Sequence, residues 1–95
     1  MPKFVIERQI PGIGKSSAAD LAGISQKSNS VLHDLNTAGY DIQWIHSYVT
    51  DDKIFCVYNA PSADIIREHA MRGNFPANAV MKVHEVIEPI TAEMT

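Results

Sequence analysis

Two strand-like segments separated by a short polar turn constrain the fold more than any other feature of this chain. Residues 41–49 and 53–58 are rich in aromatic and β-branched side chains, and only Thr50, Asp51 and Asp52 separate them. Such side chains favour extended backbone, and a short polar connection between two such segments is typical of an antiparallel hairpin. The centre of the chain is therefore predicted to be a β-hairpin.

The segments on either side of the hairpin predict one strand and one helix each. Their patterns indicate a strand over residues 4–10, a helix over 18–35, a helix over 61–73 and a strand over 80–87. The order βαββαβ is that of a ferredoxin-like α+β domain, in which two helices cover one face of a four-stranded antiparallel sheet. At 95 residues, the chain fits a single domain over residues 1–95.

Both alternating sets of side chains in the hairpin are apolar, so neither sheet face is suited to water. With a two-residue turn, the sets are Trp44, Tyr48, Phe55 and Val57 on one face, and Ile45, Val49, Ile54, Cys56 and Tyr58 on the other. The helices can cover only one face, and a chain this short leaves much apolar surface unburied. We therefore expect a homodimer, in which two sheets form a dimeric α/β barrel.

Composition excludes several classes of partner. The net charge is −3, and no basic run is interleaved with aromatic residues, so we expect no nucleic-acid binding. No apolar stretch approaches the roughly 20 residues that a membrane span needs, so we expect no membrane partner. The single cysteine cannot form an internal disulfide, and the first residues do not resemble a signal peptide, which favours a cytoplasmic location.

His69 and Cys56 are the side chains best placed to carry chemistry. His69 falls on the apolar arc of the predicted second helix, where an imidazole can bind a metal, exchange a proton or bond a ligand. Cys56, in mid-strand, offers a soft ligand for a late transition metal such as nickel, copper or zinc. Each also has a structural interpretation: His69 as a core histidine bonded to a backbone carbonyl or to Tyr58, and Cys56 as a small buried hydrophobe.

His46 and Glu7 are two further candidate metal ligands whose faces depend on strand register. A two-residue turn places His46 opposite Val57, and therefore on the other face from Cys56, whereas a bulged turn would bring His46 and Cys56 together. Glu7 shares its strand parity with Val5, so it is expected to be solvated or interfacial unless it faces a pocket as a base or hard ligand.

Several short motifs resemble those of a known family. They are Trp44-Ile45-His46-Ser47-Tyr48-Val49, Asp52-Lys53-Ile54-Phe55-Cys56-Val57-Tyr58, Ala60-Pro61, His69-Ala70 and Gly73-x-Phe75-Pro76. Over residues 40–89 the chain resembles a family of small bacterial ferredoxin-like proteins of unknown function that includes nickel-binding proteins. The resemblance implies a dimer and a transition-metal site, with Cys56 and His69 as the most transferable positions and Trp44 ahead of them. The first strand departs from the nickel-binding members because it has no histidine.

Three hypotheses of function follow. The first is a binding protein that holds a metal ion, such as nickel, or a small ligand through His69 and Cys56, with Tyr58 or Glu7 assisting. The second is a cofactor-independent enzyme similar to monooxygenases or isomerases, in which His69 is the acid or base and Tyr58 and Trp44 line an apolar pocket. The third is an interaction module in which these polar groups only satisfy one another.

Overall fold

A computed structural model describes residues 1–93 of the chain, so the last two residues of the predicted domain lie outside the described part. Its elements are β1 (Lys3–Gln9), the 3-10 turn η1 (Ile13–Lys15), α1 (Ala18–Thr37), β2 (Gln43–Val49), β3 (Lys53–Asn59), α2 (Ala63–Gly73), β4 (Ala79–Lys82) and the 3-10 turn η2 (Pro89–Glu93). The predicted order of strands and helices is confirmed.

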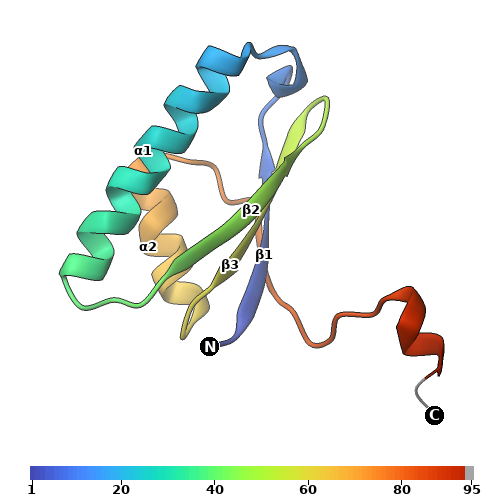
Figure 1. Cartoon of the computed structure of the whole chain (residues 1–95). Helices are drawn as coiled ribbons and strands as arrows, with labels where there is room; N and C mark the ends of the chain where they lie inside the picture. The colour runs from blue at the N-terminus through green and yellow to red at the C-terminus, as the bar shows by residue number, and fades with distance from the viewer. Residues whose placement is uncertain (94–95) are drawn as a thin grey trace.

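The four strands form one antiparallel sheet in the order β2-β3-β1-β4. Figure 1 shows α1 and α2 on the same side of this sheet. The predicted ferredoxin-like α+β fold is therefore confirmed. We call the sheet surface that the helices leave uncovered the open face.

The last strand is shorter than predicted, because it ends at Lys82 instead of residue 87. β1 begins at Lys3, and the amide of Val83 makes the last bond to that strand, a 2.8 Å contact with the Lys3 carbonyl. Residues 84–93 pair with none of the four strands. Figure 1 shows this segment leading away from the helices towards η2.

Local sequence signals account for the ends of α1. Ser17 accepts a bond from the amide of Asp20, and the Asp20 carboxylate accepts one from the amide of Ser17, which makes a capping box. After the helix ends at Thr37, Gly39 takes a φ of 95°, a conformation that suits glycine. No helix within residues 1–93 combines the length and the apolar character that a membrane span requires.

The core lies between the helices and the alternate side chains of β1 and β3. Its fully or almost fully buried members include Phe4, Ile6, Leu35, Ile42, Ile54, Cys56, Tyr58 and Ile66. Arg8 follows Phe4 and Ile6 at the same strand parity and is only 3% exposed, so a charged side chain joins this core.

A β-bulge in β2 corrects one prediction about the hairpin faces. Trp44 pairs with Tyr58, and His46 pairs with Val57, so Ile45 is an extra residue that has no partner on β3. A bulge reverses the alternation of side chains on the two sides of it. The predicted grouping of Trp44 with Tyr48 is therefore wrong: Trp44 joins Tyr58 on the helix-covered face, and Tyr48 lies on the open face. Beyond the bulge the predicted register holds, with Ser47 opposite Cys56.

Candidate functional site

A pocket of about 160 Å³ lies between the hairpin and the first half of α1. Apolar side chains form most of its wall: Ile10, Leu21, Ile24, Trp44, Val49, Ile54 and Phe75. Polar groups are contributed by Arg8, Ser25, Ser28, Ser47, Cys56 and Tyr58. An apolar cavity with a few convergent polar groups is the usual form of a small-molecule site. We call this cavity the hairpin pocket.

Trp44 forms part of the pocket wall because the bulge turns it towards the helices. Its indole Nε1 donates a 2.9 Å hydrogen bond to the hydroxyl of Ser47, three residues along the same strand. This bond fixes the orientation of the ring. Both residues that we expected to line a ligand pocket, Trp44 and Tyr58, lie in this wall.

Arg8 brings a guanidinium group to the pocket from β1. Its Nη1 donates to the carbonyl oxygen of Pro76 at 2.6 Å, and its Nε donates to the Sγ of Cys56 at 3.4 Å. Its Nη2 is buried, and no residue in the described part of the chain is its hydrogen-bond partner. Within residues 1–93, no aspartate or glutamate forms an ion pair with Arg8. A buried charge without a counter-charge is costly, so an anion held beside it would lower that cost.

Tyr58 lies beside Arg8 and remains a neutral phenol at neutral pH. Burial raises its pKa above the ordinary value of 10, and neighbouring Cys56 raises it further. Arg8 and Ser28 act in the opposite direction. Because the pKa is raised on balance, Tyr58 can donate a hydrogen bond in the pocket but does not neutralise the guanidinium.

His69 is completely buried behind the pocket and is absent from its wall. Its Nε2 lies 3.1 Å from the Oγ of Ser28, and its ring stacks on Phe75 with centroids 5.5 Å apart. Its Nδ1 has no hydrogen-bond partner among residues 1–93. Burial, assisted by the charge of Arg8, lowers the pKa of His69 to about 4, so the imidazole is neutral at pH 7.

Phe75 connects His69 to the pocket, and Gly73 makes room for its ring. A methyl group added at Gly73 would collide with the Phe75 ring. Two cations flank the same ring: the guanidinium carbon of Arg8 lies 5.6 Å from its centroid, and the Nζ of Lys27 lies 5.2 Å away. The Gly73-x-Phe75-Pro76 segment thus places an aromatic wall and a carbonyl acceptor beside Arg8.

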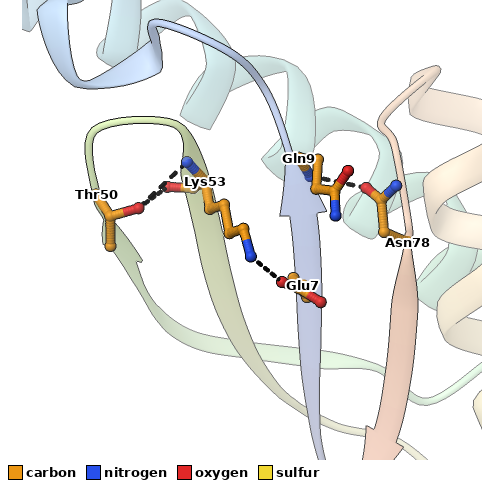
Figure 2. A network of polar contacts seen from close by, with 5 residues as sticks. All are labelled: Glu7, Gln9, Thr50, Lys53 and Asn78. Carbon is orange, nitrogen blue, oxygen red and sulfur yellow. Dashed lines mark hydrogen bonds and ion pairs between the residues drawn. The ribbon is translucent and has the colours of Figure 1, made fainter.

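The structure does not bring the four candidate metal ligands together. Cys56 and His69 lie on the helix-covered side, whereas His46 lies on the open face, edge-on to Tyr48 at 4.9 Å. Figure 2 shows the Glu7 carboxylate directed to Lys53, whose Nζ is 2.6 Å from Oε1. In the described part of the chain, no three His, Cys, Asp or Glu side chains are grouped so that they could hold a metal ion.

Arg8, Ser28 and Phe75 are site residues that were not predicted from the sequence. For Arg8 a signal was present, because it shares strand parity with Phe4 and Ile6, and a charge on the buried parity of a strand is unusual. Phe75 was noticed only as part of the Gly73-x-Phe75-Pro76 motif, and Ser28 gave no signal. Their roles depend on how closely α1 and the loop after α2 approach His69.

Comparison with known proteins supports the fold and assigns the family. The family model described as nickel responsive protein SCO4226-like matches residues 4–83. The crystal structure of SCO4226 from Streptomyces coelicolor A3(2) superposes with a TM-score of 0.72 at 17% sequence identity, covering 90% of this chain and 99% of the other. A comparison with curated protein sequences gave no match. At this identity, the structural likeness shows the fold alone.

Proposed function

The chain belongs to the SCO4226-like family of nickel responsive proteins, and on this premise we propose that it is a small binding protein that holds a small molecule in the hairpin pocket. The observation that supports this function is the pocket itself, an apolar cavity of about 160 Å³ with Arg8 and Tyr58 in its wall. The third hypothesis, an interaction module without a small-molecule site, does not account for a cavity next to Cys56. A buried His69 with a pKa of about 4, outside the pocket wall, does not favour the enzyme hypothesis.

Nickel, which the family name favours, is the second candidate ligand. The side chains that line the hairpin pocket of a single chain do not fit a nickel ion. Cys56 is the only thiol among them, no imidazole lines the pocket, and the adjacent Arg8 guanidinium repels a cation. The Nε2 of His69 is already paired with Ser28. The accessible imidazole of His46 on the open face is a better donor, and two copies joined through that face would supply two of them.

We further propose that the protein acts as a homodimer joined through the open face. Tyr48 and Met81 are 60% and 47% exposed there, and the half-buried Val5, Phe55 and Val57 lie between them. The segment after β4 exposes Val86, Ile87 and Ile90. A second copy would cover both surfaces, because a sheet face and an apolar segment of this kind are poorly suited to water.

The pocket can be tested with Trp44, the only tryptophan of the chain, as an intrinsic fluorescent reporter. We expect benzamide or benzoate to shift its emission saturably in the wild type. Ser25→Phe, which fills the pocket, should abolish the shift, whereas the matched control Ser30→Phe on the exposed side of α1 should retain it. If neither probe binds the folded wild-type protein, the proposed function is wrong.

Nickel is tested by calorimetric titration of metal-free wild type and of the Cys56→Ser, His69→Ala and His46→Ala variants. Loss of binding in His46→Ala alone would place nickel on the open face. Loss in both Cys56→Ser and His69→Ala would place it at the pocket, against the fit described above. Absence of micromolar binding in the wild type would exclude nickel as a ligand of the protein.

A further inference from the structure

We propose that the hairpin pocket selects small organic acids, and that Arg8 binds their carboxylate group. This inference rests on the proposed function, since it names the class of ligand for the same pocket. It depends on the hydrogen-bond and ring contacts of Arg8 and on the absence of an ion pair between Arg8 and a carboxylate within residues 1–93.

Arg8 is a charged side chain that the fold buries without neutralising. It is 3% exposed, and its partners are the Pro76 carbonyl oxygen, the Cys56 thiol, the neutral Tyr58 hydroxyl and the face of the Phe75 ring, none of which carries a full negative charge. Within residues 1–93, no hydrogen-bond acceptor is paired with its buried Nη2. A guanidinium fork matches the two oxygens of a carboxylate in spacing and in charge. A bound acid would therefore compensate the unpaired charge.

The groups around Arg8 supply no alternative anion. Tyr58 is neutral because its pKa is raised. The nearest acid in sequence, Glu7, points to the open face and is paired with Lys53. A second cation, Lys27, lies near the ring of Phe75, which also contacts Arg8. The local field at the pocket is thus positive in a chain whose net charge is −3.

The rest of the pocket sets the size and character of the ligand. Ile10, Leu21, Ile24 and Trp44 present apolar surface, and the volume is about 160 Å³. A cavity of roughly 150 Å³ holds one benzene ring. The ligand class is therefore a monocarboxylic acid with one ring or a branched aliphatic body. The ring would lie against Trp44, and the carboxylate would lie at Arg8, within reach of the Ser28 and Tyr58 hydroxyls.

Benzoate and benzamide test this inference because they differ in charge and hardly in shape. Titration of the full chain at pH 7, followed by Trp44 fluorescence and by calorimetry, should show benzoate binding about tenfold more tightly or better, as expected for a charge-assisted bond. In Arg8→Leu the preference should fall to about one. Arg8→Lys, which keeps the charge and loses the fork, should retain an intermediate preference.

Each outcome separates the ligand class from the existence of the pocket. Equal affinity of the wild type for benzoate and benzamide would overturn the carboxylate assignment while leaving the pocket in place. A benzoate preference that persists in Arg8→Leu would also overturn it. Binding of neither probe would reject the pocket as a ligand site. If Arg8→Leu fails to fold, the wild-type ratio and the Arg8→Lys variant still decide the question.

Discussion

The Nε of Arg8 lies 3.4 Å from the Sγ of Cys56 on the adjacent strand, so the buried guanidinium of this protein faces a thiol where a carboxylate would normally be found. Arg8 pairs with Ile54, and Cys56 pairs with Ile6, so the contact runs diagonally between neighbouring strands on the helix-covered face. The contact places the single cysteine at the polar end of the pocket.

Replacing Arg8 by leucine should leave the free energy of unfolding unchanged or raise it. A buried charge that lacks a counter-charge costs more than an apolar side chain of similar size. Urea unfolding of wild type and Arg8→Leu, without any ligand, measures the difference. A loss of more than about 2 kcal/mol would contradict this, because it would mean that the bonds to Pro76 and Cys56 outweigh the cost of burying the charge.

Gly73→Ala should destabilise the fold by about 1–3 kcal/mol, as expected for overpacking. The added methyl group collides with the Phe75 ring, which cannot stay against both His69 and Arg8. Gly23→Ala is the matched control: nothing lies within 4 Å of the added group, so it should stabilise α1 by roughly 0.5–1 kcal/mol. Urea unfolding of both variants provides the comparison, and equal effects would show that Phe75 does not depend on Gly73.

Ser28→Ala should cost about 1–3 kcal/mol, because it leaves the Nε2 of the fully buried His69 without its partner. Ser30→Ala, at an exposed position of the same helix, should change stability by less than about 0.5 kcal/mol. Thermal and urea unfolding of the two variants test this. If both substitutions have the same small effect, the Ser28–His69 bond contributes nothing to the core.

Stability should fall as the pH drops from 6.5 towards 4, because of His69. Its pKa is lowered from 6.5 to about 4 in the folded protein, so below pH 6.5 the unfolded chain takes up a proton that the folded protein refuses. The stabilising contribution is fully present above pH 6.5, and roughly 3 kcal/mol of it is lost by pH 4. In urea unfolding against pH, His69→Gln should flatten this slope, whereas the exposed control His33→Gln should leave it unchanged. Parallel slopes for all three proteins would show that His69 does not titrate in this way.

Light scattering should give a mass near twice 10.5 kDa for the wild type at micromolar concentration. Tyr48→Asp places a charge on the open face, in the exposed edge strand β2, and should yield monomers. His33→Asp, on the exposed side of α1, should remain dimeric. A monomeric wild type, or a Tyr48→Asp variant that stays dimeric, would contradict dimerisation through this face.

The fold could be predicted because local signals and overall topology agree. The hairpin composition, the helix over residues 18–35 and the helix end at Gly73 together specify the βαββαβ order. β4 was overestimated because its length depends on where its partner β1 begins, at Lys3, and not on its own composition.

The site was harder to predict because it depends on the extra residue of the bulge in β2 and on the buried charge of Arg8. The bulge at Ile45 moves Trp44 to the helix-covered face, and the sequence of β2 contains no residue that indicates a bulge. Arg8 could have been noticed from strand parity. By contrast, the distance of His69 from the pocket wall depends on the packing of Ser28 and Phe75 around it, which a sequence pattern does not encode.

The bulge at Ile45 also makes β2 serve two surfaces at once. Without the extra residue, strict alternation would send Trp44 to the same side as Tyr48, and the pocket would lose a wall while the open face gained an indole. With it, one short strand supplies an aromatic ring to each side of the sheet. Deleting a single residue at this point would therefore move the indole of Trp44 from the pocket wall to the open face, although the composition of the strand would hardly change.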